Sequence, residues 1–435
     1  MPHSDHSPSP QRVSFPDLPT FPDNVPTAPL LRISLQKLLE HDDEEQNRCW
    51  QACCELGFFY LDVRTSDTRV DDNNNNNNNN NSSSSSSNAG YSSIVDGNAL
   101  LEDVDKLFNV MQDFYDLDVT EKIKYDFKDQ GSYFGYKGYG EGIVDKQGTK
   151  DRNEFYNVRF ASSYFPIFIS KTLRLLTCHL QISKDDILGI SKPLPSPAVL
   201  NPHRGLYKSY ITSSHAICML IASLLSSRLP LKQDVREAGD LPAIHRLNAA
   251  SGDQIRFVKA PPQEQSLKGV ALGEHTDFGS VTVLFNRLGG LQVRLPEHTL
   301  PLAPTSTSPL PTDVEKKLCE DGWTYVRPLP GHCIVNLGDA LVKFSNGTLR
   351  SNIHRVVAPP GEQGSVTRYS LVYFCRPEDD VVLRSLVEGG AEDVEEPVTA
   401  KEWILRRALG RRKADGWDKS GGTESVSMRS GGMRT

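Results

Sequence analysis

The sequence lacks the features that mark nucleic-acid-binding, membrane-spanning and secreted proteins. Lys and Arg number 48 against 55 Asp and Glu, a formal net charge of −7, so the basic surface that binds nucleic acid or anionic lipid is missing. No continuous apolar run reaches the roughly 18 residues of a membrane span. Met1 is followed by Pro, His and Ser rather than by the charged start and apolar centre of a signal peptide. We therefore expect a cytoplasmic protein with no nucleic-acid or membrane partner.

Cysteine is scarce as well, at 8 of 435 residues, and the cysteines show no paired metal-binding spacing. Cys53 and Cys54 are neighbours in a predicted helix, which does not suit a disulfide framework. Reduced thiols, as in an intracellular protein, are therefore expected.

Several segments contain too few apolar residues to form a core. Residues 1–29 carry eight prolines, and Asn73–Asn81 is followed directly by Ser82–Ser87. Such composition predicts a disordered leader at 1–29 and an insertion at about 64–95. A Pro/Ser/Thr-rich loop is expected at 298–320, and the basic runs that include Arg406-Arg407 are interpreted as solvated, with a disordered tail at 409–435. The remainder divides into 30–200 and 201–408.

The foldable part begins with helices and ends with strands. Apolar periodicity predicts helices at 44–56, 99–115 and 205–229, and strands at 31–33 and 58–63. Gly57 would end the first of these helices, and Ser34 would cap a short helix that precedes it. Further short strands, separated by Gly and Pro turns, are expected at 255–258, 275–285, 291–294, 323–328, 332–336, 353–357 and 367–374. This succession is typical of a sandwich or jelly roll.

His275 and Asp277 stand out as candidate metal ligands. In an extended strand they would point to the same face, with Thr276 on the other. The same spacing occurs in His3-Ser4-Asp5 and His41-Asp42-Asp43, but only His275 opens an apolar strand pattern. Two histidines and one carboxylate form the face that binds iron(II) in non-haem enzymes.

The third ligand has two candidates. His354 follows the turn-rich Ser345-Asn346-Gly347 segment and begins a short apolar strand, whereas His332 follows Pro330-Gly331 at a turn and is expected to face solvent. The sequence pattern favours His354.

The whole pattern resembles the iron(II)- and 2-oxoglutarate-dependent dioxygenases of the isopenicillin N synthase-like superfamily, especially their fungal secondary-metabolism branch. The resemblance spans roughly residues 30 to 407, apart from the insertions. It is carried, in order, by Ala52 to Tyr60, Gly273 to Phe285, Gly289-Gly290-Leu291-Gln292-Val293, Asn336-Leu337-Gly338-Asp339, Ser345 to Val356, Arg368-Tyr369-Ser370 and Thr399-Ala400-Lys401-Glu402-Trp403.

This resemblance implies an α+β fold in which a double-stranded β-helix (jelly-roll) core at 201–408 is braced by helices and preceded by an α/β extension at 30–200. It implies that His275, Asp277 and His354 bind Fe(II) as the catalytic centre, and that Arg368 with Ser370 holds the distal carboxylate of 2-oxoglutarate. A planar guanidinium suits that carboxylate. A monomer is expected that uses dioxygen and this co-substrate to hydroxylate, desaturate or close a ring in a small organic molecule.

Two departures from the family pattern leave alternatives open. Ala260 occupies the place of a tyrosine that contacts the co-substrate in many members, and Pro359 to Gly364 lengthens the connection between His354 and Arg368. An oxidase that needs no 2-oxoglutarate, or a non-catalytic jelly-roll binding protein, would share the same scaffold. Apolar residues expected to line a pocket are Tyr133, Phe134, Tyr136 and Phe155.

Overall fold

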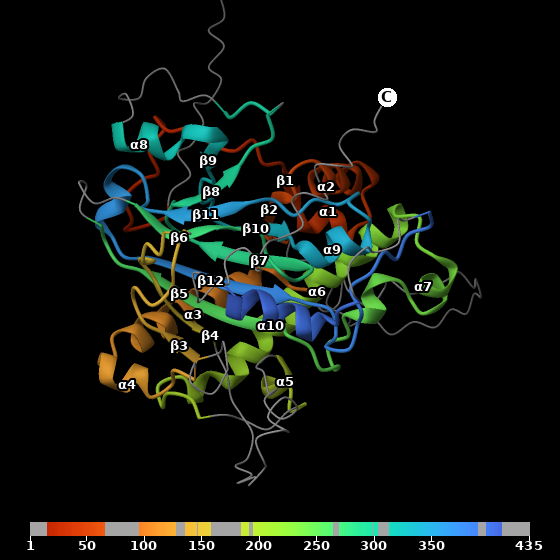
Figure 1. The fold of residues 1–435 in the computed structure, drawn as a ribbon, viewed down its shortest axis with the longest axis horizontal. Helices are drawn as coiled ribbons and strands as arrows, with labels where there is room; N and C mark the ends of the chain where they lie inside the picture. Colours follow the sequence, from red (N-terminus) through yellow and green to blue (C-terminus); the bar gives the residue numbers. More distant parts are fainter. Residues whose placement is uncertain are drawn as a thin grey trace, which may run out of the picture.

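Two β-sheets packed face to face form the centre of the protein, as a computed structural model shows (Figure 1). The structure describes residues 15–65, 95–127, 135–145, 147–157, 184–190, 195–263, 269–297, 299–302, 313–389 and 397–410. Leu284 and Val372 of one sheet and Leu291 and Val293 of the other belong to one buried cluster between the sheets. This arrangement is the jelly roll that the strand pattern predicts.

The larger sheet has the strand order β1-β2-β10-β7-β12-β5-β4-β3. Apart from the parallel pair β1 and β2, its strands run antiparallel. Their bounds are β1 Arg32–Ser34, β2 Phe58–Asp62, β3 Gly135–Lys137, β4 Glu154–Asn157, β5 Gln254–Ala260, β7 Val281–Asn286, β10 His332–Leu337 and β12 Arg368–Cys375.

The smaller sheet has the order β6-β11-β8-β9 and is antiparallel throughout. Its strands are β6 Val270–His275, β8 Leu291–Arg294, β9 Trp323–Tyr325 and β11 His354–Val357. His354 pairs with His275 across β11 and β6. This register places two candidate ligands side by side.

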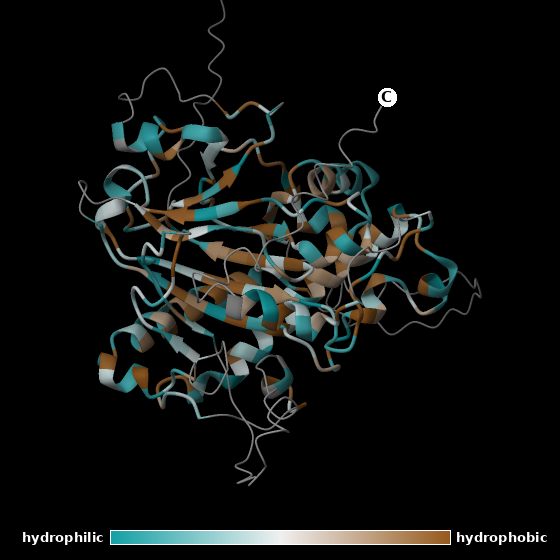
Figure 2. Ribbon diagram, viewed as in Figure 1, coloured by the Kyte–Doolittle hydropathy of each residue, from teal (hydrophilic) through white to brown (hydrophobic). Residues whose placement is uncertain are grey.

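The long helices and most of the short ones cover the outer face of the larger sheet, whereas the helix at Asp313–Leu318 lies beside the smaller sheet, where the Gln292 side chain donates to the Leu318 carbonyl. The longest are α3 Gly97–Tyr115 and α6 Arg204–Arg228, and the shorter ones are α1 Leu35–Leu39, α2 Asp43–Glu55, α4 Val119–Ile123, α5 Lys184–Ile187, α7 Gln233–Glu237, α8 Asp313–Leu318, α9 Asp339–Phe344 and α10 Ala400–Gly410. Leu371 and Tyr373 of β12 face these helices, whereas Ser370 and Val372 face the other sheet, as a period of two residues requires. One large core cluster joins the N-terminal region to the jelly roll, and Figure 2 shows hydrophobic residues concentrated there.

Helix α6 has the length and composition of a membrane span, but 78% of its apolar window is buried inside the fold. Its apolar residues are therefore accounted for by the core between α3 and the larger sheet. The predicted capping of the neighbouring N-terminal elements is confirmed. Ser34 accepts a hydrogen bond from the Lys37 amide at 3.3 Å, and Gly57 ends α2 with φ of +65°.

The prediction of a disordered leader is wrong for residues 15–29. Val25 and Ala28 are buried, the Ala28 amide donates to the Tyr325 carbonyl at 2.8 Å, and the Phe21 ring packs edge-on against Tyr325. The proline-rich segment 15–29 thus packs against the smaller sheet without forming a helix or a strand. The loop expected at 298–320 contains helix α8, while most of the Asn/Ser-rich insertion and residues 411–435 lie outside the described residues.

Candidate metal centre

The sequence predicts that His275 and Asp277 lie on one continuous strand, but the structure does not place them on one. Strand β6 ends at His275, residues 276–280 form a turn, and β7 begins at Val281. The Asp339 amide donates to the Asp277 carbonyl at 2.9 Å, and the Gly338 amide donates to the Ser280 carbonyl at 2.9 Å. The turn is therefore shaped by the start of α9, which follows β10 in the neighbouring part of the fold.

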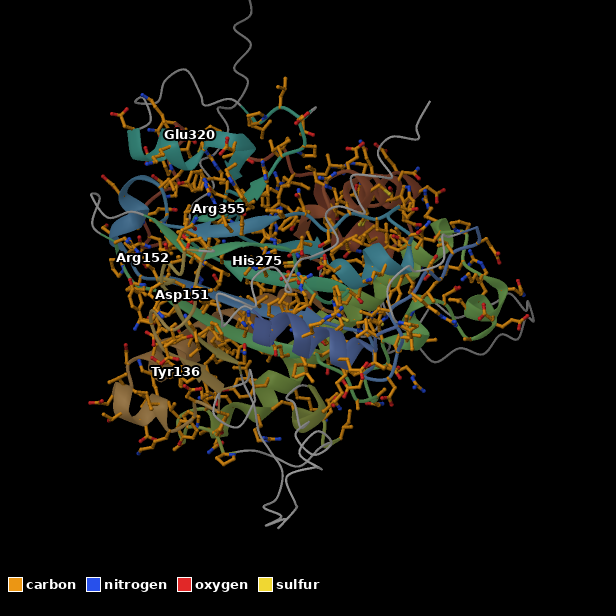
Figure 3. The ribbon with its side chains drawn as sticks, viewed as in Figure 1. Tyr136, Asp151, Arg152, His275, Glu320 and Arg355 are labelled. Carbon is orange, nitrogen blue, oxygen red and sulfur yellow. The ribbon has the colours of Figure 1, made fainter. Side chains whose placement is uncertain are left out.

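The side chains of His275, Asp277 and His354 nevertheless converge. One ligand atom of each lies within 4.8 Å of the others, and the two imidazole centroids are 4.2 Å apart. Nε2 of His354 lies 3.9 Å from Oδ1 of Asp277. Figure 3 shows His275 near the middle of the molecule. The preference for His354 over His332 thus agrees with the geometry.

Backbone carbonyls fix both imidazole rings. Nδ1 of His275 lies 2.8 Å from the Gly273 carbonyl, and Nδ1 of His354 lies 3.2 Å from the Asn352 carbonyl. A carbonyl only accepts, so these contacts place the proton on Nδ1 in the neutral rings. Nε2 then carries the lone pair that a metal needs.

The Asp277 carboxylate is oriented in the same way. Its Oδ2 accepts hydrogen bonds of 2.7 Å from the Thr282 hydroxyl and from the Asn336 amide. Burial alone raises the pKa of this carboxyl, but attraction to His354 when that ring is protonated, together with these two hydrogen bonds, outweighs burial, so the net pKa lies below the usual 3.8. The anion is thereby favoured, with Oδ1 on the side of the histidines.

These residues fit a divalent transition metal. Two neutral imidazoles and one carboxylate, each held by a hydrogen bond to its other polar atom, form the donor set of non-haem iron(II). The three groups come from adjacent strands and one turn, so they occupy one side of the position where an ion would lie. The opposite side faces the pocket described below.

The competing histidines are placed elsewhere. His41 is exposed in a turn, and His3 lies outside the described residues. His332 does not face solvent, contrary to the prediction: it is 8% exposed and accepts a hydrogen bond from Nε of Arg32 at 3.2 Å. It therefore stabilises the edge formed by β1, β2 and β10.

A second buried group of possible ligands consists of His215 on α6, Asp253, and Cys375 at the end of β12. The two Asp253 oxygens accept hydrogen bonds of 2.7 Å from the Tyr373 hydroxyl and the Arg376 amide. Nε2 of His215 lies 2.7 Å from the His245 carbonyl. Protein groups thus satisfy this cluster, and we interpret it as a core hydrogen-bond network.

A buried arginine lies at the other end of the pocket. Arg368 is 2% exposed, and it donates from Nε to the Gly289 carbonyl at 2.7 Å and from Nη1 to the Ser370 hydroxyl at 2.5 Å. Within the described part of the chain, no carboxylate lies within ion-pair distance of its guanidinium. Burial lowers its pKa to about 10. A buried cation without a carboxylate partner favours an anionic ligand.

The longer connection before Arg368 is accommodated by a 3₁₀ turn at Gly361–Ser365. Gln363 in this turn accepts a hydrogen bond from the Gly289 amide at 2.8 Å and donates one to the Pro19 carbonyl at 2.8 Å. The extra residues thus brace the same Gly289 whose carbonyl holds Arg368. They do not displace the arginine from the pocket.

The pocket between the two sheets joins the candidate metal ligands to Arg368 and Ser370. Its wall is mostly apolar, and it is lined by Phe58, Asn153, Arg256, Val258, Ala260, Ala271, Leu272, His275, Asp277, Thr282, Leu284, Leu291, Asn336, His354, Val356, Arg368, Ser370, Val372 and Phe374. Ala260 faces Arg368 directly across strands β5 and β12. Its small side chain leaves the space beside the guanidinium open.

The predicted aromatic lining is wrong for Tyr136 and Phe155, the two of its four residues that the structure describes. Tyr136 is buried away from His275, as Figure 3 shows, and its hydroxyl donates to Glu154 at 2.6 Å. Phe155 does not line the pocket, but it lies 4.7 Å from the guanidinium of Arg256, which lines the pocket and lies 4.9 Å from the Phe374 ring. Tyr133 and Phe134 lie outside the described residues.

Sequence reasoning also missed the residues that support the ligands. Thr282 and Asn336 are ordinary strand residues by pattern, and no local signal shows that they contact Asp277. Arg407, which the sequence places in a solvated basic run, is 1% exposed. Only the tertiary fold reveals these roles, because each contact joins residues far apart in the sequence.

The jelly roll and this pocket, with a His/Asp/His cluster at one end and a buried arginine at the other, have the form of a non-haem iron oxygenase. Comparison with known proteins agrees. Residues 251–377 match the 2OG-Fe(II) oxygenase superfamily. The chain is 29% identical over 385 residues to a 2-oxoglutarate-dependent dioxygenase of Aspergillus fumigatus, covering 88% of this chain and 84% of that protein.

A second relative, the 2-oxoglutarate-dependent dioxygenase iboH of Amanita muscaria, is 30% identical over 209 residues, covering 48% of this chain and 85% of that protein. Among solved structures, a full-length Neurospora crassa protein in complex with alpha-KG has a TM-score of 0.55 at 18% identity, covering 87% of this chain and 95% of that one. JOX2 in complex with 2OG, Fe and JA has a TM-score of 0.52 at 22% identity, covering 98% and 95%. These structures support the fold.

The chain belongs to the 2OG-Fe(II) oxygenase superfamily. It is an oxidoreductase of the class that uses Fe(II), 2-oxoglutarate and dioxygen on small-molecule substrates.

Proposed function

We propose that His275, Asp277 and His354 hold Fe(II), that Arg368 and Ser370 hold the distal carboxylate of 2-oxoglutarate, and that the pocket between them admits a small organic substrate. The observation that carries this proposal is that the candidate metal ligands and the buried arginine lie at opposite ends of the same pocket. Three convergent donor atoms lie at one end, and a buried arginine with no carboxylate partner within the described residues lies at the other.

Bound iron would supply the oxidative decarboxylation of 2-oxoglutarate to succinate and carbon dioxide, coupled to oxidation of the substrate. The protein's own part is to position the reactants. Asn336 and Thr282 orient the Asp277 carboxylate, and the carbonyls of Gly273 and Asn352 fix the imidazoles. The fork of Arg368 orients the co-substrate, whose far end then points towards the ligand cluster.

The apolar wall supports a mostly apolar substrate. Leu272, Leu284, Val356, Val372 and Phe374 line the pocket near the candidate ligands. These side chains exclude water and offer no hydrogen bonds, so orientation of the substrate falls to polar groups such as Arg256 and Asn153. We propose a substrate from specialised-metabolite biosynthesis, oxidised by hydroxylation, desaturation or ring closure in a cytoplasmic monomer.

The test is succinate formation from 2-oxoglutarate under air with added Fe(II). The variants His275→Ala and Asp277→Ala should lose turnover and iron binding. His41→Ala is the matched control, because His41 has the same spacing to an aspartate but lies exposed in a turn. Intact turnover in His275→Ala would sink the metal assignment. Oxygen uptake that needs no 2-oxoglutarate would instead identify an oxidase, and comparative metabolite profiling with and without the gene would find the substrate.

A further inference from the structure

The C-terminal helix α10 packs against the turn that follows His275 and carries Asp277. Trp403, Ile404 and Arg407 are 5%, 1% and 1% exposed, and their spacing places them on one face of the helix. Nε1 of Trp403 donates to the Phe278 carbonyl at 3.2 Å. Figure 1 shows α10 near the centre of the molecule, although the helix is the last element of the described chain.

Arg407 reaches the peptide between the two ligands. It donates from Nη2 to the Thr276 hydroxyl at 3.1 Å and to the Thr276 carbonyl at 3.5 Å. Thr276 lies between His275 and Asp277 in the chain. Hydrogen bonds that hold its side chain and carbonyl therefore restrict the backbone of both neighbours. The Arg407 guanidinium also lies 4.8 Å from the ring of Phe278, the residue that follows Asp277 in the sequence.

Asp339 completes this arrangement. Its carboxylate accepts from Nη1 of Arg407 at 2.9 Å and from the Thr276 hydroxyl at 3.0 Å, while its amide donates to the Asp277 carbonyl at 2.9 Å. The Arg407 and Asp339 side chains are 1% and 0% exposed. Such a pair is held in one geometry because leaving either charge unpaired in the interior is unfavourable.

We propose that Arg407 is a positioning residue for the metal centre, and that α10 is part of this centre rather than a peripheral tail. Arg407 and Asp339 together contact the backbone or side chains of Thr276 and Asp277 from the side opposite the pocket. They fix the turn that replaces the strand geometry expected between His275 and Asp277. The inference rests on the proposed iron ligands, because the turn that Arg407 contacts joins His275 to Asp277.

The experiment measures Fe(II) affinity of the full-length apoprotein by anaerobic titration calorimetry with 2-oxoglutarate present. Arg407→Met should weaken iron binding by about 10-fold to 100-fold, as is typical when a group that supports a ligand is removed. Arg406→Met is the matched control, since Arg406 is the neighbouring arginine but is exposed and lies over Trp403. That control should bind iron like the natural protein.

A thermal melt of each apoprotein separates positioning from general stability. If Arg407→Met folds and binds iron with the natural affinity, the proposal is overturned, even if its melting temperature falls. Should Arg407→Met not fold, Arg407→Lys decides, because lysine keeps the charge opposite Asp339 but lacks the fork that reaches Thr276. Weakened iron binding in Arg407→Lys supports the proposal, and unchanged binding overturns it.

Failure of the proposed function would look different. Natural protein that binds no iron, or His275→Ala that binds it equally well, would overturn the ligand assignment and with it the role of Arg407. Iron binding that depends on His275 but not on Arg407 would overturn only the positioning role.

Discussion

Asn336 donates a hydrogen bond of 2.7 Å from its side-chain amide to Oδ2 of Asp277. The two residues are 59 positions apart and meet because β10 pairs with β7 and the turn before β7 carries Asp277. Oδ2 is thereby occupied, which leaves Oδ1 for the metal side of the carboxylate. The same oxygen accepts from Thr282, so the carboxylate has one preferred rotation.

Removal of this hydrogen bond should weaken metal binding without unfolding the protein. We expect Asn336→Ala to raise the iron dissociation constant by about 10-fold, since groups that orient a ligand typically contribute 10-fold to 100-fold in affinity. Thr282→Val should also raise the iron dissociation constant, and the double variant should raise it more than either single substitution. Titration calorimetry of the apoproteins measures this effect, and wild-type affinity in the double variant would contradict it.

Loss of the guanidinium at position 368 should affect the co-substrate rather than iron. Hydrogen bonds to charged groups contribute about 1.5 to 3 kcal/mol, so Arg368→Gln should weaken 2-oxoglutarate binding by about 10-fold to 100-fold. Arg368→Lys keeps the positive charge but lacks the planar guanidinium that can donate two parallel hydrogen bonds, so we expect an intermediate loss of 2-oxoglutarate affinity. The measurement is the 2-oxoglutarate dissociation constant of the iron-loaded protein.

The exposed Arg294 provides a control for this experiment, because it lies on β8 in the sheet opposite Arg368. Arg294→Met should leave 2-oxoglutarate affinity unchanged. Equal affinities for Arg368→Gln and the natural protein would show that the pocket holds the co-substrate by other groups.

Gly57 should tolerate no side chain. Its φ is +65°, and a Cβ there would lie 2.0 Å from the Arg350 carbonyl oxygen. A left-handed conformation costs a non-glycine residue about 1 to 2 kcal/mol, and overpacking adds about 1 to 3 kcal/mol. We therefore expect Gly57→Ala to lower the free energy of unfolding by about 2 to 5 kcal/mol in urea titrations.

The matched substitution Gly205→Ala should be neutral or stabilising. Gly205 lies in the first turn of α6, and a Cβ there meets nothing within 4 Å. Replacing a helical glycine by alanine typically stabilises by about 0.5 to 1 kcal/mol. A large loss of stability in this control would show that the protein is sensitive to any such substitution, so the effect at Gly57 could not be assigned to its tight turn.

The sequence by itself determined the kind of elements and the identity of the candidate ligands. Apolar periodicity located α3 and α6, and the short strands between turns indicated a jelly roll, because these signals are local. His275, Asp277 and His354 stood out because imidazoles and a carboxylate are metal ligands and lie near predicted apolar strands, whereas Arg368 was indicated by the resemblance to a known family. Local pattern could also place Gly57 at the end of a helix, since a positive φ favours glycine.

Only the tertiary structure decided how these ligands meet and what supports them. The turn at 276–280 replaced the predicted continuous strand because α9 and α10 supply hydrogen bonds to its backbone from distant parts of the chain. His332 and Arg407 became buried because Arg32 and Asp339 lie beside them, and residues 15–29 became ordered because they cover β9. Such outcomes depend on which surfaces pack together, and a linear pattern of residue types carries no information about that.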